Sequence, residues 1–158
     1  MAAGKWKMYE FAKKYLADGT LDLDLTTNMN VALFLVAGNA NTLSVGTGVY
    51  GDLTSEHANG NGYTTGGQAL VGEVYTQTAG VATFDCTTDP VWTASGTGII
   101  ARYAVVYVNA TVNSIVKPLI CVCLLDTTPA DVTATAGNTL TIAMNASGLF
   151  TVSGMTAD

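Results

Sequence analysis

The hydrophobic period of this chain changes after its first nineteen residues, and this change constrains the fold more than any other feature. In the first segment, apolar residues have the i, i+3, i+4, i+7, i+8 spacing of one helical face. They are Met8, Phe11, Ala12, Tyr15 and Leu16. After this segment, apolar residues alternate with polar ones or form short runs, as they do in β-strands. We therefore predict one helix at the start of the chain and β-structure after it.

Eight short segments are predicted strands, because they are rich in Val, Ile, Thr and Tyr and most are bounded by Gly, Asn, Asp or Pro. They are residues 21–25, 31–36, 68–75, 81–86, 99–108, 118–125, 139–144 and 149–152. Many short strands without alternating helices are typical of an all-β sandwich or closed barrel. We expect a jelly-roll-like β-sandwich, divided into an N-terminal helical arm (1–19) and a β-sandwich domain (20–158).

Residues 38–67 form a long polar segment that does not fit the strand pattern. The tetrapeptide NGNG at 59–62 repeats a dipeptide that favours turns with positive φ. Loops of this length are uncommon in compact domains and are usually functional or part of an interface. We therefore expect an interface loop, with these contact residues: Tyr50, Asn59, Asn61 and Tyr63.

Charge is sparse and unevenly distributed. Charged residues make up 11% of the chain and hydrophobic residues 49%, so few charges keep its surface apart from its neighbours. Four lysines against two acids give the first nineteen residues a net charge of +2, and the remainder carries −8. An acidic body repels phosphates, which argues against nucleic acid as a partner. No apolar run approaches the roughly 18 residues that span a bilayer, so we expect no membrane partner.

The residues that could carry chemistry lack the surroundings that such chemistry requires. Residues 46–51 match GxGxxG, but without the preceding strand and following helix that bind a pyrophosphate. His57 is the single histidine, and the chain has no GxSxG motif. Cys121 and Cys123 have strand spacing and no second ligand pair for zinc. We predict a non-enzymatic protein with no catalytic residue, cofactor or metal site, and interpret its three cysteines as buried free thiols.

The predicted N-terminal helix carries four aromatic residues, more than so short an element can cover by itself. It either packs on its own domain as a lid or anchors the protein on a partner. We favour the anchor, because few contacts hold chain termini in place. The expected apolar contacts are Trp6, Tyr9, Phe11 and Tyr15, and the expected basic contacts are Lys5, Lys7, Lys13 and Lys14.

A series of motifs extends over residues 7–144. KMYEFAKKYLADGTLDL leads into VALFL, followed by ANGNGYTTGGQAL, TFDCTTDPVWTASG, ARYAVVYV, PLICVCLLD and GNTLTI. This series resembles a family of small virion structural proteins that tailed bacteriophages and prophages encode. The resemblance implies a particle component without catalytic residues, and its simplest form is a capsid decoration (cement) protein. Such proteins are β-rich, often jelly rolls, and commonly trimeric.

The resemblance also implies partners and a location. The expected partners are the major capsid protein and two further copies of this chain in a homotrimer on the outer capsid surface of the virion. We expect synthesis in the cytoplasm of the bacterial host, since the first segment lacks the apolar stretch of a signal peptide. Two alternatives remain open: a tail, connector or fibre-associated virion protein, and a carbohydrate-binding β-sandwich module for host attachment. Exposed Tyr50 and Tyr63 would support the module.

Overall fold

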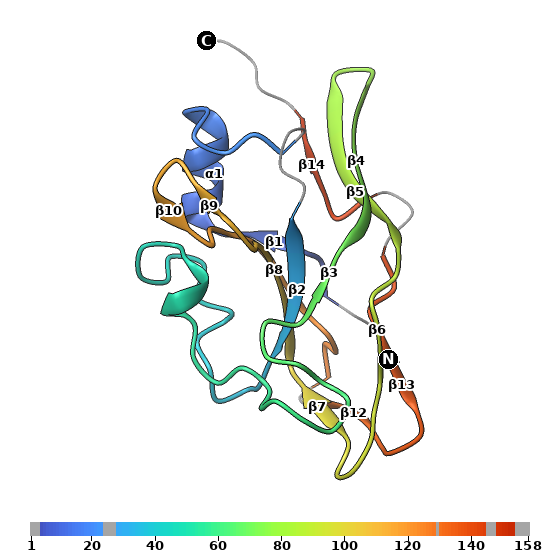
Figure 1. Ribbon diagram of the computed structural model, residues 1–158. Helices are drawn as coiled ribbons and strands as arrows, with labels where there is room; N and C mark the ends of the chain where they lie inside the picture. Colours follow the sequence, from blue (N-terminus) through green and yellow to red (C-terminus); the bar gives the residue numbers. More distant parts are fainter. Residues whose placement is uncertain (1–3, 24–27, 129, 145–147, 154–158) are drawn as a thin grey trace.

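The computed structural model describes residues 4–23, 28–128, 130–144 and 148–153. Within these ranges, regular structure consists of antiparallel strands, one α-helix, α1 (Glu10–Ala17), and one short 3-10 helix, η1 (Tyr50–Asp52). The all-β, sandwich-like class predicted from the sequence is confirmed, and so is the N-terminal helix (Figure 1). No helix in the described ranges is long and apolar enough to cross a membrane.

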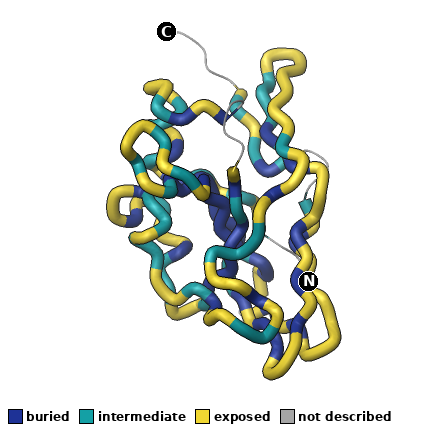
Figure 2. The backbone as a smooth tube through the Cα atoms, viewed as in Figure 1, coloured by how far each residue is buried: buried dark blue, intermediate teal, exposed yellow. Residues whose placement is uncertain are grey.

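One layer is a five-stranded antiparallel sheet with the strand order β1-β11-β8-β2-β3. Its three central strands are almost wholly buried (Figure 2), as expected for strands that read as continuous apolar runs. The strands, in sheet order, are β1 (Lys7–Met8), β11 (Leu119–Leu124), β8 (Tyr103–Val108), β2 (Met29–Phe34) and β3 (Gln68–Ala69).

The second layer combines three small sheets, with the orders β14-β5-β4, β13-β6 and β12-β7. Figure 1 shows most of them on the opposite side of the molecule from α1. A further hairpin pairs β9 (Thr111–Val112) with β10 (Ile115–Val116). The strands of the second layer are β4 (Val71–Thr78), β5 (Val81–Thr88), β6 (Val91–Thr93), β7 (Ile99–Ala101), β12 (Val132–Ala134), β13 (Thr139–Thr141) and β14 (Phe150–Val152).

The five-stranded sheet is covered on both faces. Leu33 and Val106 belong to the cluster that fills the space between the layers, together with Trp92 and Leu140 from the second layer. The neighbouring positions on the same strands face the other way, since successive strand residues alternate between faces. That opposite face forms a second cluster with α1 and the first part of the 38–67 segment.

Three predicted strands differ from the structure. Residues 21–23 form no strand, although Leu21 and Leu23 are buried; the other two residues of the predicted 21–25 strand lie outside the described ranges. The predicted strand 68–75 is divided, because the chain crosses from the first layer to the second at Leu70. The predicted strand 99–108 is divided in the same way at Arg102, between β7 and β8. Apolar content predicted strand character here but not the change of layer.

Candidate functional site

The N-terminal segment is built into the sandwich. Strand β1 pairs antiparallel with β11 and forms one edge of the five-stranded sheet. Before the strand, the Gly4 N–H donates a hydrogen bond to the Leu124 carbonyl oxygen at 2.7 Å. After it, the Tyr9 N–H donates to the Ile120 carbonyl oxygen at 3.0 Å. The described residues of the expected arm, 4–19, therefore pack as part of the same body as the sandwich.

Tyr9 is the clearest departure from the expected anchor. Its side chain is fully buried among the residues that cover the outer face of the five-stranded sheet. Its hydroxyl donates a hydrogen bond to the carbonyl oxygen of Ala40 at 2.5 Å. Burial raises the pKa of Tyr9 far above its usual value, so the hydroxyl stays protonated. The expectation that Tyr9 contacts a partner is corrected: this side chain belongs to the protein's own core.

Phe11 and Tyr15 are half-buried on α1 and contact the long loop. Their ring centroids lie 6.0 Å apart, and the Tyr15 hydroxyl donates to the Thr47 carbonyl oxygen at 3.2 Å. Phe11 lies so close to Gly48 that a Cβ there would come within 2.4 Å of the Phe11 Cβ. Both rings therefore help to hold α1 against the loop, and a partner contact by either remains a prediction.

The structure divides the four N-terminal lysines into two pairs. All four are exposed. Lys14 forms an ion pair with Asp18 across one helical turn, 2.7 Å between Nζ and Oδ2, and this hydrogen bond holds the pKa of Asp18 at about 2. Lys5 and Lys13 line a groove that is described below, whereas Lys7 and Lys14 do not. Sequence reasoning treated the four as one basic surface.

The 38–67 loop is organised by the carboxylate of Glu56, a residue that sequence reasoning did not single out. The carboxylate accepts hydrogen bonds from the hydroxyls of Tyr50 and Tyr63, the latter at 2.6 Å. It also accepts one from the Gly66 N–H at 2.6 Å. The Tyr50 ring stacks on Tyr107 of β8 with 4.2 Å between centroids. These contacts hold Tyr50 against the outer face of the sheet, whereas Tyr63 belongs to the cluster between the layers.

The four residues expected on an interface loop therefore have partners within the chain. Tyr63 is 2% exposed, so it is not an exposed stacking residue of the kind a sugar-binding module needs. The Asn59 side-chain oxygen accepts a hydrogen bond from the Thr65 N–H at 3.3 Å. The Asn61 side-chain oxygen accepts one from the Thr97 N–H at 3.2 Å and so ties the loop to the β6–β7 connection. Binding of a partner by this loop remains a prediction.

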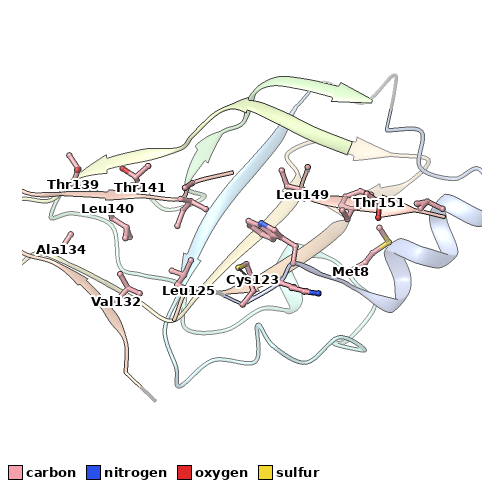
Figure 3. A pocket seen from close by; sticks show the side chains of 18 of the residues that line it. Met8, Cys123, Leu125, Val132, Ala134, Thr139, Leu140, Thr141, Leu149 and Thr151 are labelled. Atoms are coloured by element: carbon pink, nitrogen blue, oxygen red, sulfur yellow. Dashed lines mark hydrogen bonds between the residues drawn. The ribbon is translucent and has the colours of Figure 1, made fainter. Parts of the chain in front are cut away.

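An open groove of about 1160 Å³ lies along one side of the sandwich. One wall comes from the N-terminal segment at the edge of the five-stranded sheet, and the other from β12, β13 and β14 of the second layer. Figure 3 shows Leu140 and Leu149 on one side of the groove and Cys123 and Leu125 on the other. Because its walls come from opposite ends of the chain, no local sequence pattern predicted this groove.

The groove has an apolar floor and a basic rim. Trp6 and Met8 are half-buried side chains of the N-terminal segment that line it, and Phe150 is one from β14. Among the described residues that line it, Lys5 and Lys13 are the charged ones, in a chain whose net charge is −6. The arrangement suits an apolar segment that carries negative charge.

A second hollow of about 550 Å³ continues the groove toward the end of the molecule where α1 lies. The two hollows share Met8, Lys13, Phe150 and Val152 as lining residues. Leu16 of α1 and Tyr75 of β4 line the second hollow as well. Together the hollows form one continuous surface, which we call the edge groove.

The three cysteines are free and buried, which confirms the interpretation of the sequence. The Cys123 thiol lines the edge groove and donates a hydrogen bond to the Gly4 carbonyl oxygen at 3.2 Å. Burial raises the pKa of Cys123 to about 11 and that of Cys121 well above its usual value. The thiolate, which is the reactive form, is therefore scarce at neutral pH.

Within the described ranges, no three side chains of His, Cys, Asp or Glu gather in a way that would hold a metal ion. The chain was also compared with protein-family models, curated protein sequences and solved structures, and none of them matches it.

Proposed function

We propose that this protein is a structural component of a tailed-phage virion: a capsid decoration protein that binds the outer shell as a homo-oligomer, most simply a trimer. The observation that carries the proposal is the edge groove, an apolar surface that remains open in the single chain. Extended apolar surfaces on soluble proteins mark interaction sites. The motif series over residues 7–144 supplies the phage context through its resemblance to virion proteins.

Three further features support a role in assembly. The chain has few charges, and interface cores are depleted of charge. Large apolar side chains are exposed on several strands, among them Val71, Val91, Ile100 and Val116. A shell protein also gains from many weak contacts, which add up when a particle carries many copies. The major capsid protein is the partner that this function requires.

The test is binding to phage particles that lack the protein. Purified protein is mixed with undecorated capsids, and the number of bound copies per particle is measured by quantitative mass spectrometry and electron microscopy. Hundreds of copies on the outer shell support decoration. A dozen or fewer at one vertex would instead identify a connector or tail component, and no binding to any particle contradicts a virion role.

A carbohydrate-binding module is the alternative from a different functional class. Its signature would be retention on a glycan array at micromolar protein concentration, with loss after substitution of an exposed aromatic residue such as Tyr75, which is 42% exposed. Binding to capsids without retention on the array excludes this alternative.

A further inference from the structure

The β4–β5 hairpin is an unusually exposed element. Every residue of β4 except Glu73 is exposed. The exposed fraction is 57% for Val71, 38% for Val74 and 42% for Tyr75. Strand β4 also forms the edge of its sheet, in the order β14-β5-β4. Figure 2 shows the exposed ribbon extending beyond the body. Natural proteins shorten, cover or charge such edges unless another chain pairs with them.

The hairpin is preformed. Seven residue pairs hold β4 on β5, from Val71↔Thr88 to Thr78↔Val81. The connecting residues Ala79 and Gly80 both have positive φ, +51° and +81°, as the two-residue turns of twisted hairpins require. A rigid ribbon loses little conformational freedom when it binds, which favours its use as an interaction element.

The hairpin and the larger hollow of the edge groove have complementary charge, whereas the second hollow also contains Asp22. Glu73 and Asp85 are the hairpin's charged residues, whereas Lys5 and Lys13 are the charged residues of the larger hollow. Residues 15–101, which include the hairpin, contain eight acids and no lysine or arginine. Opposite charges across an interface guide association and fix the relative orientation of the partners.

We propose that the β4–β5 hairpin of one protomer docks in the edge groove of a second copy of this chain. Within its own chain the hairpin reaches only the second hollow, through Tyr75, and leaves the larger hollow open, because β5 is paired with β14, which forms part of that hollow's wall. The contact joins Val74 to the apolar floor near Leu140 and Phe150, and Glu73, which faces the other side of the strand, is directed toward the basic rim. This inference rests on the self-association in the proposed function.

The contact is heterologous, because it joins two different surfaces of the same chain. Repeated around an axis, such a contact closes into a ring, and three copies give the trimer. The competing arrangement pairs β4 with β4 of a second copy around a twofold axis. That arrangement gives a dimer and brings together two strands that each carry Glu73, without a basic residue on either hairpin.

The first test is site-directed cross-linking in the full chain. Gln77→Cys places a thiol on the exposed hairpin, and Thr141→Cys places one on β13 at the groove wall. The two variants carry different affinity tags, are produced in the same cells, and are treated at pH 7 with a short bis-maleimide. We expect a covalent dimer that contains both tags. Thr111→Cys, an exposed position on β9 outside the groove lining, replaces Thr141→Cys in the control and gives no dimer joined between positions 77 and 111.

Each other outcome contradicts either the hairpin–groove contact, the self-association or the capsid role. A covalent dimer from Gln77→Cys alone, in which peptide mass spectrometry finds position 77 joined to position 77, would show β4–β4 pairing and overturn the hairpin–groove contact. An oligomer in sedimentation without the expected cross-link overturns this contact and leaves the proposed function standing. A monomer that still decorates capsids overturns self-association alone, and a trimer that binds no particle overturns the capsid role alone.

The second test is a charge exchange. Lys13→Glu and Glu73→Lys should each weaken self-association in sedimentation equilibrium by roughly fivefold or more, as expected when one member of an interfacial charge pair is reversed. Both changes in one chain should restore most of the loss. Lys7→Glu is the matched control, because Lys7 is an exposed lysine of the same segment that does not line the groove. Equal effects of Lys13→Glu and Lys7→Glu, or no recovery in the double variant, would contradict the contact.

Discussion

The hydroxyl of Tyr9 donates a hydrogen bond to the carbonyl oxygen of Ala40, 31 positions later in the chain, at 2.5 Å. This bond joins the N-terminal segment to the start of the long loop inside the core. Replacing Tyr9 with Phe leaves the Ala40 carbonyl buried without this donor, which should lower the free energy of unfolding by about 1–3 kcal/mol. Urea unfolding measures the change. Tyr15→Phe, which removes a hydroxyl at the exposed loop contact, should cost less than Tyr9→Phe.

Deletion of residues 1–17 should abolish or severely weaken folding. The deletion removes β1, α1 and the buried Tyr9 side chain together, and loss of one large buried aromatic side chain alone costs about 3–5 kcal/mol. Circular dichroism and thermal melting of the truncated chain check this. A truncated protein as stable as the parent would contradict the integration of the segment and restore the free-arm interpretation.

Stability should fall in alkaline solution because buried tyrosines resist ionisation. Burial raises the pKa of Tyr107 to about 12, and the pKa values of Tyr50 and Tyr63 are raised further by burial and by the nearby Glu56 carboxylate. In the unfolded chain tyrosine titrates near pH 10. The unfolded state therefore releases protons first as the pH rises, so the contribution of these tyrosines to stability is constant below about pH 9 and declines from about pH 10 to 12.

Denaturation midpoints recorded every half pH unit check this expectation. Tyr107→Phe should make the alkaline decline less steep, whereas Tyr75→Phe, an exposed residue, should leave it unchanged. A midpoint that does not change up to pH 12 would contradict the assignment.

Gly48 and Gly19 form a matched pair of glycines. Both have positive φ, +76° and +72°, so alanine is strained at either position by about 1–2 kcal/mol. An added Cβ at Gly48 would also lie 2.4 Å from the Cβ of Phe11, whereas at Gly19 it meets nothing within 4 Å. We therefore expect Gly48→Ala to be the more destabilising of the two in urea unfolding. Equal losses of stability in the two variants would show that α1 can move away from the loop without lowering the free energy of unfolding.

Labelling of the thiols should be slow and depend on pH. The pKa of Cys123 is raised to about 11, so its reaction with a maleimide should accelerate about tenfold for each pH unit between pH 7 and 10, in proportion to the thiolate. Cys121 is fully buried and should react only when the protein unfolds. Mass spectrometry of peptides labelled for increasing times separates the two sites. Rapid labelling of both at pH 7 would contradict the burial.

The sequence predicted those parts of the fold that depend on local patterns. The apolar run at 31–36 predicted a buried strand, and β2 occupies most of it; the helical spacing around Phe11 predicted α1. The helical spacing did not reveal that Lys7 and Met8 precede the helix as a strand, because two residues carry no recognisable period. The pairing of that short strand with β11 depends on a partner more than a hundred positions away.

Local sequence patterns could not predict the candidate site for the same reason. Lys5 and Lys13 were expected to contact a partner, but nothing in their neighbourhood indicated that Leu140 and Phe150 would form the facing wall. Glu56 was overlooked because a single acid in a polar loop has no pattern. Its importance comes from the two tyrosine hydroxyls that the fold brings to its carboxylate.

The crossings at Leu70 and Arg102 also govern how the molecule can fold. At each point one continuous stretch of chain supplies a strand to both layers, β3 to β4 and β7 to β8. Neither layer can therefore be completed as an independent unit, and the strands of each must find partners that are distant in sequence. Such non-local topologies close large loops before they gain packing energy and fold slowly, in milliseconds to seconds. The two layers should consequently form and melt in a single cooperative transition, without a half-folded intermediate that retains only one sheet.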